Sequence, residues 1–293
     1  MRGLGYNGRM PKPYDATLNA LLSVRPEDWA AHFGRIAGIP PGPAETLDTD
    51  LATTVQSDRV FRIAGASPAL LHLELESDAR LGTPRELLRY NTLLDLQYDL
   101  PVETVLVLLR PKADTSDRTG VYERIGPSGA TVCRFRYSVV RVWELSVAQW
   151  LACGPGLAPL ALLTEEATTD LESAVARVRD TVRETAPNPD VAETVFASSF
   201  ILCGLRHNMD LAKEIFRSLH MIMEDSSTYQ GVVTIGRVLE RREMVLWLGT
   251  KRFGAPPENV STVLKSITDL NQLQRLSDFA LTATGWDDLL RGV

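Results

Sequence analysis

Between Leu70 and Glu76 the sequence alternates leucine with polar residues, and this pattern constrains the fold more than any other stretch. Strict alternation predicts a half-buried β-strand, because side chains two residues apart share one face. The leucines at 71, 73 and 75 then face a core, and the other face carries His72, Glu74 and Glu76. Neighbouring carboxylates repel each other unless a proton or cation lies between them, and such oxygen-rich sites suit Mg²⁺ or Mn²⁺. On these residues alone a solvated strand face is the simpler interpretation, because acidic side chains mostly lie at protein surfaces.

Hydrophobic periodicity divides the chain into an α/β part and a helical part. Residues 1–13 are rich in glycine and proline and are expected to form a disordered lead. Further elements are expected as strands at 59–63, 105–109 and 133–142, a helix at 84–98, and a loop or hairpin at 112–130. Beyond residue 164 the patterns are helical. We therefore predict an α/β domain at 14–163, with the run at 105–109 in the centre of a mixed or parallel sheet, and a helical domain at 164–293.

Composition narrows the classes of protein that fit. The formal net charge of −6 argues against a purely electrostatic nucleic-acid binder, although a local basic patch is compatible with it. Three cysteines without metal-ligand spacing favour free thiols in a reducing compartment: Cys133, Cys153 and Cys203. No stretch has the length and apolarity of a membrane span, and the first residues lack the apolar middle of a signal peptide. The resulting prediction is a cytoplasmic protein without a membrane partner.

Some familiar motifs lack the context that gives them meaning. The Gly-x-Gly-x-x-Gly match at 3–8 has no strand before it, so a dinucleotide site is not expected. The His-x-Glu at 72–74 matches zinc deaminases, but no Pro-Cys-x-x-Cys follows. His32 and His207 lie in helical patterns, where core or surface positions are expected rather than metal ligation.

A third acid joins the pair on the alternating strand. Asp58 stands at the head of the strand at 59–63, and only a short loop separates that strand from the acidic one. Short connections favour antiparallel neighbours, so Asp58 is expected to reach the same metal as Glu74. An Asp on one strand and Glu-x-(Lys, Gln or Glu) on the next is the layout of the PD-(D/E)XK nuclease core. Carboxylate-held magnesium suits phosphodiester hydrolysis, because the metal polarises the phosphate and lowers the pKa of a water.

The chain resembles the bacterial Rpn family, recombination-promoting nucleases that are also described as transposases. The likeness covers most of the chain in order and spacing: YDATL (14–18), SDRVFRI (57–63), LHLELE (71–76), LLRYN (87–91), LPV (100–102), VLLRP (107–111), residues 135–144 and EDSSTYQ (224–230). The resemblance implies a restriction-endonuclease-like fold, with a mixed sheet flanked by helices. It also implies a Mg²⁺-dependent DNA endonuclease, a hydrolase linked to DNA recombination or transposition. It also implies that Asp58 and Glu74 bind the metal.

Glu76 departs from the family pattern. It falls where family members usually have Gln or Lys, and a third acid does not supply the positive charge of a lysine. With Asp58 and Glu74 it completes the expected catalytic set. From the sequence alone, Glu76→Lys is expected to restore the commoner pattern and to preserve or increase cleavage.

Arginines beside the acidic strand are the expected DNA-backbone contacts: Arg62, Arg85 and Arg89. Surface solubility is the alternative interpretation of these three residues. The alternative function for the whole chain is a nuclease-fold protein that has lost turnover and serves as an interaction module. Under either function the helices beyond residue 164 are candidates for homo-oligomerisation.

Overall fold

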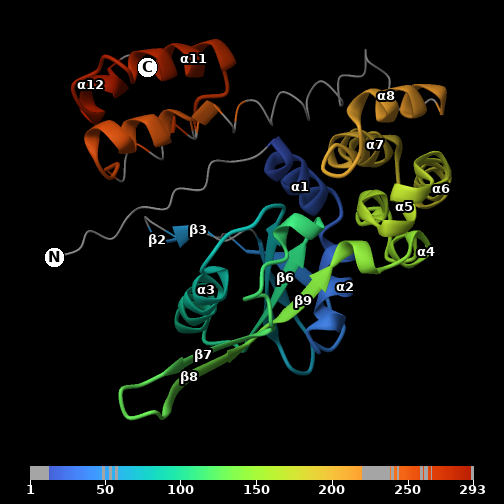
Figure 1. Ribbon diagram of the computed structural model, residues 1–293, viewed down its shortest axis with the longest axis horizontal. Helices are drawn as coiled ribbons and strands as arrows, with labels where there is room; N and C mark the ends of the chain where they lie inside the picture. Colours follow the sequence, from blue (N-terminus) through green and yellow to red (C-terminus); the bar gives the residue numbers. More distant parts are fainter. Residues whose placement is uncertain are drawn as a thin grey trace. The chain divides into compact units, whose positions relative to one another are not determined.

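The computed structural model (Figure 1) describes residues 13–47, 50–52, 55–56, 59–219, 238, 241–242, 244–257, 260, 263–264 and 266–291. The predicted disordered lead therefore lies outside the described residues, except Pro13, where helix α1 (Pro13–Val24) begins. The chain forms two compact units, residues 21–223 and residues 1–20 together with 224–293. The boundary predicted near residue 164 falls inside the larger unit.

A mixed five-stranded sheet forms the centre of the larger unit, in the order β1-β4-β5-β6-β9. Its strands are β1 (Ala44–Thr46), β4 (Arg59–Ile63), β5 (Ala69–Glu76), β6 (Val102–Leu108) and β9 (Ser138–Arg141). The pairs β1–β4 and β4–β5 are antiparallel, whereas β5–β6 and β6–β9 are parallel. This sheet confirms the predicted α/β class, while the narrower restriction-endonuclease-like fold stays a prediction. A separate antiparallel pair consists of β2 (Asp50–Ala52) and β3 (Val55–Gln56).

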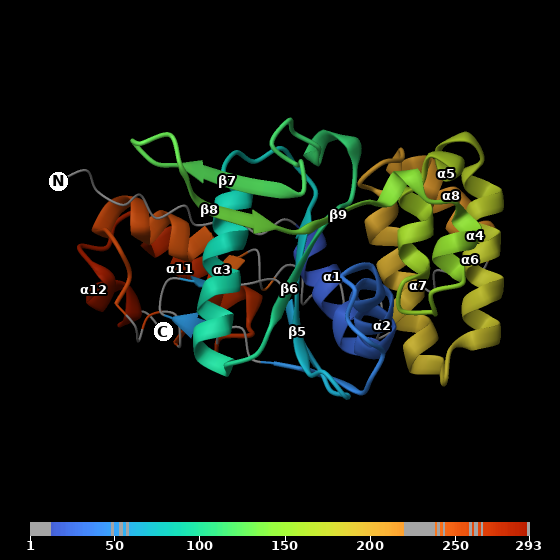
Figure 2. The same cartoon turned by 90° about the horizontal axis from the view of Figure 1, so that it is seen from below.

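Helix α3 (Thr83–Tyr98) makes the crossover that the parallel pair β5–β6 requires, and it confirms the helix predicted at 84–98. Gly82 precedes it at φ 86°, a left-handed conformation that suits glycine, and Pro84 fits its first turn. Figure 2 shows α3 and α2 (Pro26–Ile36) on opposite sides of the sheet. Both faces of the central strands are therefore covered by helices.

The strand predicted at 133–142 is in fact two strands that belong to different sheets. β8 (Thr131–Arg136) pairs antiparallel with β7 (Val121–Ile125) as a hairpin, and β9 begins after Tyr137 in the main sheet. The segment predicted as a loop or hairpin is thus a short 3-10 turn, η1 (Pro111–Ala113), followed by a loop and the first strand of this hairpin.

The helices that follow the sheet gather around a buried segment. All side chains of the 3-10 helix η3 (Ala158–Leu163) are buried, and α4, α6 and α7 pack against it. The elements here are η2 (Val142–Glu144), α4 (Val147–Leu151), α5 (Glu165–Thr169), α6 (Leu171–Thr185), α7 (Pro189–Cys203) and α8 (Met209–Ser218). Five of these helices begin with a side-chain oxygen that accepts a backbone N–H bond, from Ser146, Thr164, Asp170, Asn188 and Asn208. In the described part of the chain, every element beyond residue 164 is helical.

The smaller unit has a core of its own. Its buried apolar side chains include Val245, Leu264, Leu273 and Leu289. Its helices include α11 (Leu270–Phe279) and α12 (Trp286–Leu290). Among the helices that the structure describes, none combines the length and hydropathy needed to cross a bilayer.

His32 on α2 packs in the core against α4, which is one of the two positions, core or surface, expected from its helical pattern. Its ring lies 4.8 Å from the ring of Phe33 and 5.2 Å from that of Trp150. Nδ1 lies 3.1 Å from the sulfur of Cys153, whose thiol donates to the Gln149 carbonyl oxygen. Burial, and secondly the charge of Arg35, lower the pKa of His32 to about 4.

This buried imidazole predicts acid sensitivity. Unfolded histidine titrates near pH 6.5, so between about pH 6.5 and 4 the unfolded state binds a proton that the folded state does not. Stability is therefore lost as the pH falls through that window, by up to about 3 kcal/mol at 1.36 kcal/mol per pH unit. We expect urea unfolding at pH 7 and pH 4.5 to show a smaller acid loss for His32→Leu than for wild type. Equal losses in both proteins would contradict this assignment.

Candidate active site

The acid-bearing face of β5 is buried. The strand forms as predicted, and its three polar residues share one face. Every residue of the strand is buried, however, so the prediction of a half-buried strand with a solvated face is wrong. The exposed fractions are 0% for His72, 4% for Glu74 and 2% for Glu76. Helix α3 covers this face, where the ring of Tyr90 lies 5.6 Å from that of His72. Carboxylates in such surroundings require specific partners.

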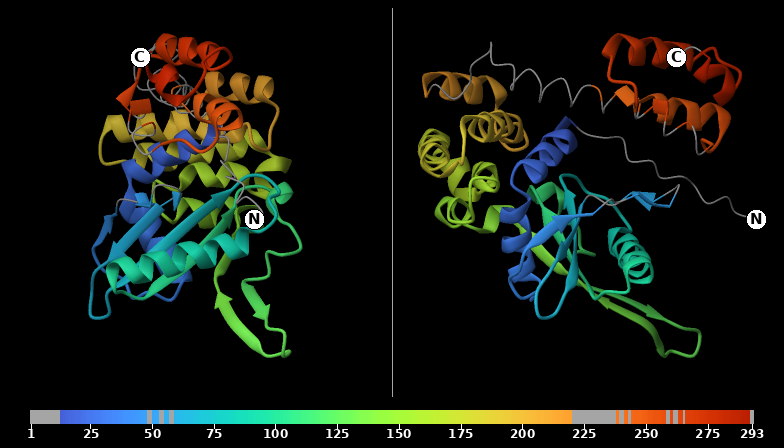
Figure 3. Two further views of the ribbon diagram at one scale, coloured as in Figure 1. Left: turned by 90° about the vertical axis from the view of Figure 1, so that its left-hand side faces the viewer. Right: turned by 180° about the vertical axis from the view of Figure 1, so that it is seen from behind.

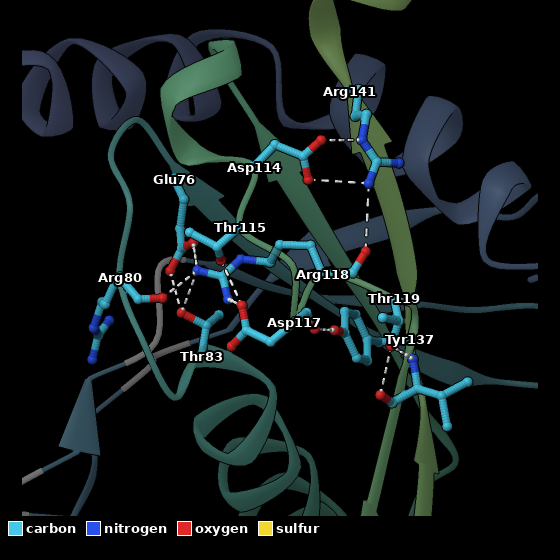
Figure 4. Close-up of polar contacts among 11 residues, drawn as sticks. Glu76, Arg80, Thr83, Asp114, Thr115, Asp117, Arg118, Thr119, Tyr137 and Arg141 are labelled. Atoms are coloured by element: carbon cyan, nitrogen blue, oxygen red, sulfur yellow. Dashed lines mark hydrogen bonds and ion pairs between the residues drawn. The ribbon is translucent and has the colours of Figure 1, made fainter.

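Both carboxylate oxygens of Glu76 are bound. The hydroxyl of Thr83, at the start of α3, donates to Oε1 at 2.6 Å, and Arg118 Nη2 donates to Oε2 at 2.7 Å (Figure 4). The positive end of the helix dipole adds to the favourable environment of this carboxylate. Glu76 therefore connects the end of β5 to α3 and to the loop that follows β6.

Arg118 is the residue that sequence reasoning missed. Its side chain is 0% exposed, and besides Glu76 it donates to the Arg80 carbonyl oxygen at 2.6 Å and to Thr83 Oγ1 at 3.0 Å. Nη1 donates to Asp117 Oδ1 at 2.9 Å. A buried guanidinium is tolerated because charged and polar acceptors surround it. Its pairing with Glu76 across 42 residues of sequence leaves no local signal that would have revealed it.

The loop that carries Arg118 is itself held at several points. Arg141 on β9 donates from Nε and Nη2 to the two Asp114 oxygens, at 2.8 and 3.1 Å, and Tyr137 Oη donates to the Asp117 carbonyl oxygen. Burial raises the pKa of Tyr137, so its hydroxyl stays a donor. An open pocket of about 500 Å³ lies here, lined by Asp114, Thr115, Ser116, Arg118, Thr119 and Arg141. Because the loop is fixed by these bonds, the Arg118 guanidinium is held in place (Figure 4).

His72 belongs to a polar contact between α3 and β6. Its Nδ1 lies 3.4 Å from Thr104 Oγ1, and the Asn91 amide donates to the same hydroxyl at 3.1 Å and to the Val102 carbonyl oxygen at 2.8 Å. These bonds attach the crossover helix to the strand beneath it. The contact explains the buried histidine as a packing residue.

Asp58 lies outside the described residues, so its predicted convergence with Glu74 stays a prediction. The described register of β4 on β5 ends with Arg59 opposite Leu73, the residues that adjoin Asp58 and Glu74 in sequence. Within the described residues, no group of three His, Cys, Asp or Glu side chains is placed to hold a metal ion. The predicted three-acid metal site therefore stays a prediction.

The three predicted DNA-contact arginines do not form one patch. Arg62 on β4 pairs with Leu70 at the far end of β5, and its side chain forms an ion pair with Glu45 at 3.7 Å. Arg85 and Arg89 are exposed on the first turns of α3, beside the Glu76 end of the strand. Six residues of strand separate the two ends, or about 20 Å. Only Arg85 and Arg89 therefore lie near the acids.

Comparison of the chain with family models, curated proteins and solved structures gave no match. The resemblance to the Rpn nucleases thus stays a prediction from the sequence.

Proposed function

We propose that this protein is a metal-dependent DNA endonuclease in which Asp58 and Glu74 bind Mg²⁺ or Mn²⁺. The observation that supports it most is the buried carboxylate of Glu74, on the central strand of a mixed sheet, two residues before an acid with a fixed cationic partner. Carboxylate oxygens are the ligands that Mg²⁺ prefers, so Glu74 fits such an ion. A bound ion would polarise the scissile phosphate and lower the pKa of the attacking water.

We assign Glu76 a positioning role rather than that of a metal ligand. Thr83 and Arg118 already occupy its two oxygens, so little coordinating capacity is left. In this arrangement Glu76 holds the Arg118 guanidinium at the end of β5, beside the position where the Rpn nucleases usually have Gln or Lys. Arg118, from the loop at 114–119, thereby supplies a positive charge next to Glu76.

The alternative function is an interaction module without catalytic turnover, and the Glu76–Arg118 ion pair also fits that function. A fully bonded Glu76 is also what a purely structural residue would show. Catalysis separates the two functions, because only an enzyme converts DNA in a metal-dependent manner.

Incubation with supercoiled plasmid should give nicked and linear DNA with MgCl₂ or MnCl₂ and no product with excess chelator. We expect Asp58→Asn to lower the nicking rate by roughly a hundredfold or more, because a lost metal ligand removes several kcal/mol of transition-state stabilisation. Glu103→Gln is the matched control, since Glu103 is an exposed carboxylate on neighbouring β6. Wild-type protein that is folded yet inert with both metals would reject the enzyme and leave the interaction module.

A further inference from the structure

The β7–β8 hairpin projects from the sheet unit. Its base is fixed, because Tyr122 and Phe135 pack against the apolar cluster that includes Leu87 of α3, and Tyr137 N donates to the Gly120 carbonyl oxygen. Its far end extends away from the strands and helices of the same unit in both views of Figure 3. An isolated two-stranded ribbon is only marginally stable in water. This hairpin is therefore stabilised by the packing of its base, which also sets its direction.

The hairpin is cationic in a chain of net charge −6. Residues 121–136 contain three arginines, Arg124, Arg134 and Arg136, against one acid, Glu123, and all four are exposed. Within the described residues none of the three guanidinium groups forms an ion pair, whereas Arg118 and Arg141 at the adjoining site are both paired. Three unpaired arginines on one projecting element are therefore available to an anionic partner.

The geometry of the ribbon favours duplex DNA as that partner. Arg134 and Arg136 share one face of β8, about 7 Å apart along the strand. A duplex carries one phosphate charge per about 1.7 Å of its axis, and its major groove admits a two-stranded ribbon. Near the tip, Ile125 and Val132 are 55% and 63% exposed, which adds apolar surface for contact with sugars and base edges.

We propose that the β7–β8 hairpin is a DNA-contact arm whose arginines, Arg124, Arg134 and Arg136, bind phosphates of the duplex presented to the active site. The proposal rests on the nuclease function and adds a surface to it. The arm begins three residues after Arg118, so DNA held along the ribbon lies beside the Glu76–Arg118 pair. This surface is distinct from the three arginines expected from the sequence.

Binding of a fluorescent 30-base-pair duplex, measured by anisotropy in chelator between 50 and 200 mM KCl, tests the arm without cleavage. The variant carries Arg124→Gln, Arg134→Gln and Arg136→Gln. Each phosphate contact contributes about −0.9 to the slope of log K against log salt, so losing three should make the slope shallower by about 2.7. Taken from 1 M salt down to 0.1 M salt, that change weakens binding by roughly 500-fold. In cleavage assays KM should rise while kcat changes little.

The matched control carries Arg177→Gln, Arg179→Gln and Arg183→Gln on α6, with the same change of charge elsewhere in the unit. Equal weakening by both triple variants, or no change in the hairpin variant, would overturn the arm while leaving the nuclease intact. Unchanged DNA affinity with loss of a dimer in sedimentation would assign the hairpin to a second copy of the chain instead. A wild-type protein that neither binds nor cleaves duplex DNA would reject the proposed function and the arm together.

Discussion

Replacing Glu76 with lysine should destabilise the folded protein by about 4 kcal/mol or more. The change removes the buried partner of Arg118 and places a second cation beside it, and breaking a buried pair by itself costs about 3–5 kcal/mol. At about 2–4 °C per kcal/mol, the melting temperature should fall by roughly 10 °C. The sequence alone predicts that this substitution preserves cleavage, whereas the buried ion pair predicts that it destabilises the folded protein. Denaturant unfolding and a thermal melt measure the effect directly.

Two variants show whether the ion pair is the cause. Glu76→Leu combined with Arg118→Met removes both charges of the buried pair and should recover most of the lost stability. Asp117 loses its contact with Arg118, but its side chain is 36% exposed and still accepts from the Thr115 hydroxyl. Asp180→Lys breaks the exposed Arg179–Asp180 pair, and its effect should stay within about 1 kcal/mol because water screens that pair. A Glu76→Lys protein as stable as wild type would show that Glu76 and Arg118 are not paired in solution.

Replacing Glu74 with glutamine should abolish metal-dependent cleavage while the protein stays folded. The substitution keeps the size of the side chain but removes the charge that holds the ion, and several kcal/mol of transition-state stabilisation correspond to about a thousandfold in rate. Metal should also cease to stabilise the protein. An ion present at a hundred times its Kd stabilises the wild type by about 2.7 kcal/mol, and that increment should vanish in the variant.

Thermal melts with and without MnCl₂ separate this loss from misfolding. The control is Glu103→Gln, which should retain both the metal-induced shift and cleavage. If Glu74→Gln keeps the full metal-induced shift, the ion is bound elsewhere and Glu74 is not its ligand.

The local pattern predicted the parts of the fold that depend on local physics. Alternation from Leu70 to Glu76 places a strand and divides its faces correctly, and the spacing of Leu87 and Leu94 fits a helix that packs on that strand. The apolar run at 105–109 predicts a buried strand because only a strand covered on both faces tolerates it. Each of these signals lies within the element that it predicts.

What the sequence did not show depends on distant partners. A glutamate in an alternating strand has the same pattern whether water or an arginine faces it, so burial of Glu76 could not be inferred without Arg118. Likewise the break at Tyr137 reflects which strands its neighbours pair with, since the residues on both sides alternate alike. Nothing in the pattern marks where one sheet ends and another begins.

The acids on β5 also have a consequence for how the chain reaches its fold. A pairing shifted by one residue would turn His72, Glu74 and Glu76 toward the apolar α2 face and the leucines toward Arg118. A shift by two residues would move the Glu76 carboxylate about 7 Å from its guanidinium and leave that buried carboxylate without its cation. Strand pairings shifted by one or two residues therefore have a higher free energy than the native pairing. The leucine-rich centre of the sheet, a sequence that could otherwise aggregate, is left with one low-energy alignment.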